Sequence, residues 1–141
     1  MVYFVDSNIF LRVIVKESES SFNDCLSFLK LAEGGEVRCR TSFLVLAEVV
    51  WMLSSYYRLP KQKIVASLQG IEGLGIKIID DFHFGTALRT YRDSSVKYID
   101  ALIASIEQIQ RKEWSIVSYD RDFDKIAVLR KEPGQVIKQI L

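Results

Sequence analysis

Residues 3–8 have the sequence Tyr3-Phe4-Val5-Asp6-Ser7-Asn8, in which an apolar run stops at a carboxylate. The run favours a β-strand, and Ser7 and Asn8 are residue types that commonly begin a helix. The apolar segment 9–15 then predicts a buried helix, so the stretch is the start of a βα unit. Open α/β sheets bind ligands at the carboxyl ends of their strands, which makes Asp6 a candidate metal-binding or catalytic carboxylate. The simpler alternative is that Asp6 only caps the helix.

The rest of the chain alternates helices with short strands. Apolar residues at helical spacing predict helices over residues 18–31, 43–57, 60–68 and 82–91, and a further helix that begins near Asp100. Short apolar or alternating runs predict strands at 37–40, 76–79 and 115–118, and a last strand or short tail at 136–141. This order predicts an α/β fold of three layers (α/β/α) with a central, mainly parallel sheet. The length of 141 residues suits a single domain, 1–141.

Composition excludes several kinds of protein and site. The chain is 49% apolar and 26% charged with a net charge of +1, as in a globular domain without a strongly basic surface. No apolar run reaches the ~18 residues of a membrane span and no signal peptide is visible, so we expect a cytoplasmic protein without a membrane partner. The single histidine, His83, and the cysteines, Cys25 and Cys39, lack the spacing of a zinc site. Phosphate-binding glycine motifs and a nucleophile elbow are also absent.

Carboxylates are the chemical groups that remain, and Glu48 is the most informative of them. It lies within the predicted helix 43–57, which is apolar nearly all round and is therefore predicted to be largely buried. A buried carboxylate needs a partner, a metal ion or a proton, although a narrow exposed stripe would also explain Glu48. Asp100 stands in the first turn of its helix, where its charge also complements the helix dipole. Asp81 is predicted to cap the helix 82–91.

Acidic residues also follow the strand 115–118, in the positions Asp120, Asp122 and Asp124. They repeat the arrangement of Asp6 after the first strand, and an exposed acidic turn is the alternative. Because strand ends meet at one edge of a parallel sheet, Asp6 and Asp120 are expected to be neighbours, and Glu48 and Asp100 can reach them from flanking helices. Carboxylates within ~4–6 Å repel one another, and a divalent cation relieves that repulsion. Oxygen ligands alone favour one or two Mg²⁺ or Mn²⁺ ions, which suits phosphodiester hydrolysis.

Four short motifs occur in order along the chain: Asp6-Ser7-Asn8, Ala47-Glu48-Val49, Asp100-Ala101-Leu102-Ile103-Ala104 and Ser118-Tyr119-Asp120-Arg121-Asp122-Phe123. Together they resemble the PIN-domain ribonucleases, especially the VapC-type toxins of toxin–antitoxin pairs, over the whole chain. The resemblance implies a Mg²⁺- or Mn²⁺-dependent endoribonuclease that cuts single-stranded RNA with metal-activated water and leaves 5′-phosphate and 3′-hydroxyl ends. It also implies a homodimer and a cognate antitoxin protein whose tail blocks the acidic site.

The resemblance also implies roles for individual residues. Asp6, Glu48 and Asp100 are the expected metal ligands, and the fourth acid is either Asp120 or Asp122, of which Asp120 is nearer the strand end. Side chains that would hold a ligand or a water are Ser7, Asn8 and Ser118, the last at a position where threonine is common in the family. Candidate phosphate contacts are Arg12, Arg38, Arg40 and Arg121.

Two other functions compete with the nuclease. An aspartyl-phosphate phosphatase or phosphoacceptor would use Asp6 as its nucleophile, but the haloacid-dehalogenase type needs a second aspartate where this chain has Asn8. A non-catalytic module that binds RNA or protein is the second alternative, although all the acidic residues of the catalytic pattern are present.

Overall fold

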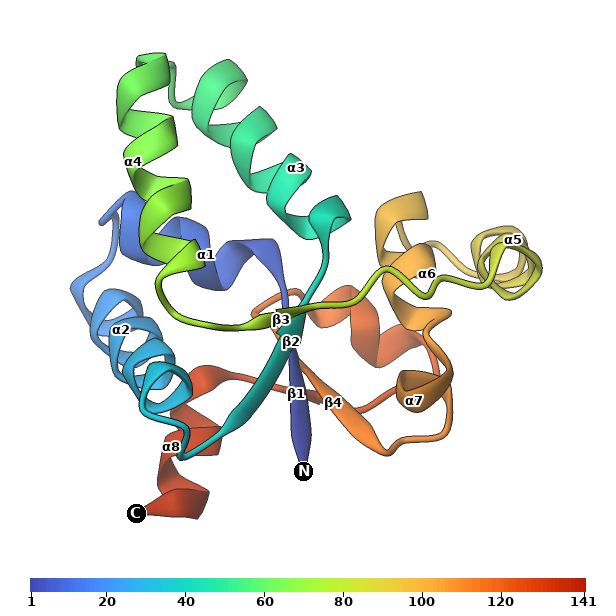
Figure 1. Cartoon of the computed structure of the whole chain (residues 1–141). Coiled ribbons are helices and arrows are strands. Elements are labelled where there is room, and N and C mark those ends of the chain that lie inside the picture. The colour runs from blue at the N-terminus through green and yellow to red at the C-terminus, as the bar shows by residue number, and fades with distance from the viewer.

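The structure of the chain, a computed structural model, describes residues 1–141 and contains a five-stranded sheet whose strand pairs are all parallel. The strands are β1 (Val2–Val5), β2 (Arg38–Thr41), β3 (Lys77–Ile78), β4 (Trp114–Val117) and β5 (Arg130–Lys131). Their order is β3-β2-β1-β4-β5, so the first strand of the chain lies at the centre of the sheet (Figure 1). The predicted α/β class is confirmed, and the sheet is parallel throughout.

Helices cover both faces of this sheet. They are α1 (Ser7–Ile14), α2 (Glu19–Glu33), α3 (Phe43–Trp51), α4 (Lys61–Glu72), α5 (Phe84–Asp93), α6 (Tyr98–Ala104), α7 (Glu107–Gln110) and α8 (Pro133–Ile140). A π-helical turn, η1 (Met52–Tyr56), continues α3, and a 3-10 turn, η2 (Arg121–Lys125), follows β4. In Figure 1, α1 and α2 lie on one side of the sheet and α6 and α7 on the other, which gives the predicted three layers. None of these helices combines the length and the apolar character needed to cross a membrane.

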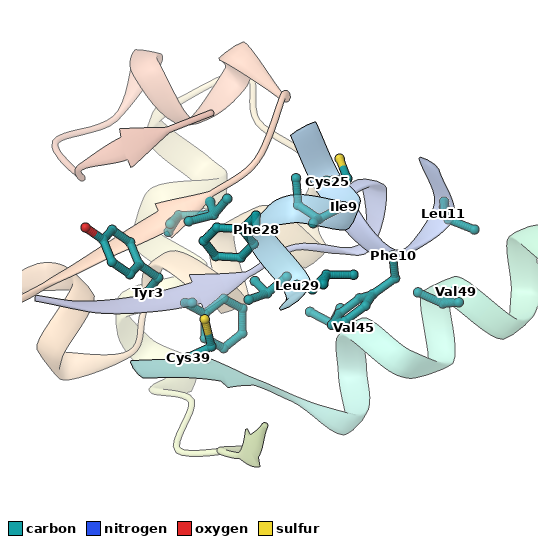
Figure 2. Close-up of a cluster of buried hydrophobic side chains, with 14 of the residues drawn as sticks. Tyr3, Ile9, Phe10, Leu11, Cys25, Phe28, Leu29, Cys39, Val45 and Val49 are labelled. Atoms are coloured by element: carbon teal, nitrogen blue, oxygen red, sulfur yellow. The ribbon is translucent and has the colours of Figure 1, made fainter. Parts of the chain in front are cut away.

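The main core lies between the central strands and the helices. It is a cluster of 23 buried residues, in which side chains of β1, β2, α1, α2 and α3 pack together (Figure 2). Phe4 and Val5 are fully buried because helices cover both faces of a parallel sheet. Val5 pairs with Val117 of β4, and Phe4 pairs with Arg40 of β2, so the carboxyl ends of these strands lie side by side.

The starts of three helices show how local sequence directs the fold. Ser18 and Ser42 accept hydrogen bonds from backbone N–H groups in the first turns of α2 and α3. α1 begins earlier than predicted, because its N-cap is Asp6, whose carboxylate accepts a hydrogen bond of 2.8 Å from the Ser7 backbone N–H. Asp6 therefore does cap the helix, and this role leaves its second oxygen free for other contacts.

The prediction that Asp81 caps a helix from residue 82 is wrong. The helix α5 begins at Phe84, and His83 is its N-cap residue without a side-chain hydrogen bond. The neighbouring Asp80 instead accepts a hydrogen bond of 3.0 Å from the backbone N–H of Phe43. Its carboxylate thus satisfies a donor in the first turn of α3, an element far away in the sequence.

The predicted strand or tail at 136–141 is also wrong, because residues 136–140 belong to α8. Pro133 stands in the first turn, and the side chains of Glu132 and Gln135 form a capping box with backbone N–H groups. The last strand is instead the short β5, which pairs with β4 at the edge of the sheet.

α3 is not largely buried, contrary to the prediction from its composition. Val45 and Val49 are fully buried, whereas Phe43 and Trp51 are 64% and 62% exposed. The helix therefore turns one apolar side toward the core and another toward solvent. An all-round apolar pattern does not distinguish a core helix from a helix with an apolar outer surface of the kind that marks interaction sites.

Candidate metal centre

The carboxyl edge of the sheet gathers acidic side chains from four elements. Asp6 directly follows β1 and Asp120 lies just beyond β4, while the flanking helices α3 and α6 carry Glu48 and Asp100 (Figure 1). The Asp6 backbone N–H donates a hydrogen bond of 3.1 Å to the carbonyl of Val117, which keeps the two strand ends together. Asp6 and Asp120 are thus neighbours, as the strand order requires. Burial raises the pKa of Asp6 and of Asp100, and nearby charges add to both shifts: those of Glu48 and Asp120 for Asp6, and those of Asp6 and Asp120 for Asp100.

Asp6 is buried and held by three donors. The residue is only 3% exposed. One oxygen accepts from the Ser7 backbone, and Oδ2 accepts from the Ser118 hydroxyl at 2.6 Å and from Asn8 Nδ2 at 3.2 Å. Burial raises the pKa of Asp6 to about 6; the hydrogen bonds from Ser118 and Ser7 act in the opposite direction, and the nearby carboxylates add to the rise. The free-energy cost of burying the charged Asp6 carboxylate is thus only partly offset by its hydrogen-bond donors.

Asp100 is equally buried but lacks such donors. It is 3% exposed, and its Oδ2 has no hydrogen-bond partner. Burial, followed by the charges of Asp6 and Asp120, raises the pKa of Asp100 to about 8, while the ammonium of Lys97 lowers it. A buried carboxylate oxygen without a partner is costly, and a proton or a cation would relieve that cost.

Asp100, Asp120 and Asp122 form the tightest acidic group. One carboxylate oxygen from each lies within 4.8 Å of the others. Asp120 also accepts a hydrogen bond of 2.9 Å from the Asp122 backbone N–H, so both acids belong to one turn. Oxygen donors at this spacing, including the unpartnered oxygen of Asp100, fit a hard divalent cation such as Mg²⁺ or Mn²⁺. Asp6 and Glu48 lie near this group but are not members of it.

Glu48 and Ser7 contact each other across the edge. Glu48 is half-buried on α3, and its carboxylate accepts a short hydrogen bond from the Ser7 hydroxyl at the start of α1. The backbone N–H of Ser7 meanwhile donates to Asp6. Ser7 therefore connects two of the acidic side chains.

Asn8 and Ser118 join the two central strand ends. Asn8 Nδ2 donates to the Ser118 hydroxyl at 2.9 Å, and Asn8 Oδ1 accepts from the Tyr119 backbone N–H at 3.1 Å. The Ser118 oxygen also accepts from the Asp120 backbone N–H at 3.0 Å. This position requires a hydroxyl, because the side chain donates one hydrogen bond to Asp6 and accepts two, from Asn8 Nδ2 and from the Asp120 backbone N–H.

Comparison with known families gives the chain its classification. The sequence profile of the PIN domain matches residues 3–129. The chain belongs to the PIN domain family. No curated protein sequence gives a significant match.

Solved structures show the same fold. The VapBC2 complex of Rickettsia felis bound to a DNA fragment from its promoter matches with a TM-score of 0.65 and 23% identity, over 94% of this chain and 98% of that chain. PAE2754 from Pyrobaculum aerophilum matches with a TM-score of 0.68 and 14% identity, over 99% and 95% of the chains. VapC20 of Mycobacterium tuberculosis, a toxin that cleaves the sarcin–ricin loop, matches with a TM-score of 0.64 and 13% identity, over 90% and 96%.

The four arginines singled out from the sequence do not gather at the acidic edge of this PIN domain. Arg38 pairs with Val2 at the amino ends of the strands, opposite the acidic edge. The guanidinium of Arg40 lies 5.9 Å from the ring of Trp114, the first residue of β4, and so is also directed toward the amino ends. Arg12 stacks at 4.0 Å on the ring of Tyr119, and Arg121 is exposed in η2. These positions put Arg12 and Arg121 nearer to the acidic turn than Arg38 and Arg40.

Sequence reasoning missed two basic residues at the edge of the PIN domain. Lys97 Nζ lies 3.8 Å from Asp120 Oδ2, and Arg130 donates to the carbonyl of Ser118 at 3.0 Å and to both oxygens of Asp124. Lys97 stands three residues before Asp100, a spacing that brings side chains together at a helix start. No sequence signal indicates Arg130, because its contacts depend on the pairing of β5 with β4.

Proposed function

We propose that this PIN domain is a Mg²⁺- or Mn²⁺-dependent endoribonuclease that hydrolyses phosphodiester bonds of single-stranded RNA. The unpartnered, buried oxygen of Asp100 within the acidic group of Asp100, Asp120 and Asp122 carries the proposal. A cation would relieve the cost of burying that oxygen, and three oxygen donors at this spacing suit one. When bound, the metal activates water and neutralises charge on the phosphate.

The side chains of the centre would have different roles in metal binding. Asp100 and Asp120 would be ligands, and Asp122 stands close enough to join them, so both candidates for the fourth acid are available. Asp6 would be a further ligand whose orientation is set by Ser118 and Asn8. Glu48, positioned by Ser7, would contact the metal directly or through water. Orientation of ligands by such hydrogen bonds strengthens metal binding.

The alternative in which Asp6 is a phosphorylated nucleophile has less support. Both oxygens of Asp6 accept hydrogen bonds from within the chain, and the residue is almost fully buried. A non-catalytic binding module would have the same fold. An RNA-cleavage assay distinguishes the two functions, because the binding module would not cut RNA when a divalent metal is added.

We further propose that the protein is the toxin of a toxin–antitoxin pair in the cytoplasm. Support comes from the fold shared with VapBC2 and with VapC20, a toxin that cleaves the sarcin–ricin loop. A cognate antitoxin protein would then be the partner, and its tail would occlude the acidic centre.

A homodimer is proposed from the exposed apolar side chains of α3, which carries Glu48, and of α5, which packs on α6. Phe43 and Trp51 on α3 and Phe84 and Leu88 on α5 are large, apolar and exposed. A second copy of the chain would cover them. Trp51→Glu is expected to shift the protein from dimer to monomer in sedimentation velocity, whereas the control Glu107→Gln should leave it a dimer. If Trp51→Glu also remains a dimer, these side chains do not form the dimer interface.

The deciding experiment is expression of the chain with and without the protein encoded next to it, followed by mapping of cleaved RNA ends. The proposal predicts growth arrest and new 5′-phosphate ends only when the neighbour is absent. Asp100→Asn should abolish both effects. Purified protein that cuts no single-stranded RNA in Mn²⁺ would favour the binding module instead.

A further inference from the structure

Lys97 extends a positive charge toward the acidic edge from the start of α6. Its Nζ lies 3.8 Å from Asp120 Oδ2, and its side chain is 64% exposed. Lys97 is the N-cap residue of α6, but its side chain makes no cap hydrogen bond. The ammonium is therefore tied to the protein by a single long ion pair, with most of its side chain in solvent.

A purely structural role does not account for this placement. An ion pair with an exposed partner at such a distance contributes little to folding stability. The other lysine near the acidic group, Lys125, is held more firmly, since it lies 2.9 Å from Asp122 Oδ1 and donates to Ser95 at 3.4 Å. Lys97 is thus the lysine that can leave its carboxylate for another anion.

The chemistry of the centre indicates which anion this is. RNA must bring a phosphate to an edge that carries several carboxylates, and these carboxylates repel it unless positive charge is present. The metal supplies part of that charge. The ammonium of Lys97, on a flexible and exposed stem beside Asp120, supplies a further positive charge.

Building on the nuclease function proposed above, we propose that Lys97 binds a phosphate of the RNA substrate at the centre. When RNA is absent, its ammonium competes with the divalent ion for the carboxylates. Loss of the charge then has opposite effects on the two ligands, because the metal gains the carboxylates and RNA loses a contact. A residue that merely supported the fold would weaken the binding of both.

The test compares Lys97→Met with Lys97→Arg, and uses Lys63→Met on the exposed side of α4 as the charge control. Calorimetry measures Mn²⁺ binding to the RNA-free protein. Fluorescence anisotropy measures the binding of a labelled single-stranded RNA pool in Ca²⁺ over a series of salt concentrations. Thermal unfolding checks that each variant is folded.

Lys97→Met is expected to bind Mn²⁺ about threefold more tightly, since an exposed cation beside the ligands is removed. It is expected to bind RNA about fivefold more weakly, with a log–log salt slope lower by about 0.7, the value for one lost phosphate contact on a single strand. Lys97→Arg and Lys63→Met should both resemble the wild type in these measurements.

Unchanged RNA affinity and unchanged Mn²⁺ affinity in Lys97→Met would overturn the role of Lys97, as would an equal loss of RNA binding in Lys97→Arg. The nuclease function is judged separately, by Mn²⁺-dependent cleavage with the wild type. If the wild type binds RNA but does not cleave it, while Lys97→Met weakens that binding with the reduced slope, the nuclease function fails and the phosphate contact of Lys97 stands.

Discussion

The Ser118 hydroxyl donates a hydrogen bond of 2.6 Å to Asp6 Oδ2 and thereby joins residues at the ends of two neighbouring strands, β4 and β1. The same oxygen accepts from Asn8 Nδ2 and from the Asp120 backbone N–H. One hydroxyl thus orients a buried carboxylate and anchors the start of the turn that carries Asp120. The acidic centre depends on this connection, because its members come from segments that are distant in the sequence.

Ser118→Ala is expected to weaken Mn²⁺ binding and RNA cleavage about tenfold, the range found when a partner that orients a ligand is removed. The pKa of Asp6 should rise further, since the hydrogen bond from Ser118 lowers it. Ser118→Thr keeps the hydroxyl and should retain both activities. Calorimetric Mn²⁺ titration of the three proteins checks this, and equal affinities in Ser118→Ala and wild type would contradict it.

The stability of the metal-free protein should fall as the pH rises from about 4 to about 8. Burial raises the pKa of Asp6 to about 6 and that of Asp100 to about 8, whereas the ordinary value is 3.8. Within this window the folded state binds more protons than the unfolded state, so the free energy of unfolding decreases with pH and levels off above it. Asp6 alone accounts for about 3 kcal/mol.

Urea denaturation in EDTA at pH 5 and pH 8 measures this dependence. Saturating Mn²⁺ should recover stability at pH 8, because the metal binds the deprotonated carboxylates of the folded state only. Higher stability at pH 8 than at pH 5 in EDTA would show that the acidic residues are not buried together.

Asp100→Asn should abolish RNA cleavage and the stabilisation by Mn²⁺, while the fold survives. In EDTA at pH 8 the variant should be more stable than the wild type by about 1–2 kcal/mol, because a buried charge beside Asp6 and Asp120 is lost. Asp6→Asn should likewise abolish cleavage. Asp93→Asn, an exposed acid paired with Arg92, is the matched control and should leave cleavage unchanged. Full activity in Asp100→Asn would remove it from the centre.

Arg130→Met should lower the free energy of unfolding by about 2–3 kcal/mol and weaken Mn²⁺ binding as well. The Arg130 side chain is 11% exposed and holds Ser118 and Asp124, the two ends of the segment that carries Asp120 and Asp122. Its loss leaves the carbonyl oxygen of the buried Ser118 without this donor and frees the exposed Asp124.

Arg92→Met is the control for Arg130→Met, since Arg92 pairs with Asp93 on the exposed surface. Chemical denaturation and Mn²⁺ titration of both variants distinguish a positioning role from general destabilisation. If Arg130→Met lost stability but kept the wild-type Mn²⁺ affinity, Arg130 would support the fold alone.

The local sequence determined most of the elements and the identity of the acidic residues. Three elements form as their sequence patterns predict: the strand before Asp6, the helix capped by Ser42 and the strand before Ser118. They form because backbone preferences, caps and side-chain periodicity act over a few residues. The β–α alternation then limited the chain to a parallel sheet, in which Asp6 and Asp120 had to be neighbours.

Only the tertiary structure decided what depends on distances between elements. It left Trp51 exposed on α3 and brought Lys97 and Arg130 to the acidic turn. It also placed Asp120 and Asp122 together beside Asp100, although the sequence offered them as alternatives. The physical reason is that burial and charge–charge contacts arise when segments pack across the sheet, and the pairing of β1 with β4 joins residues that sequence spacing does not relate.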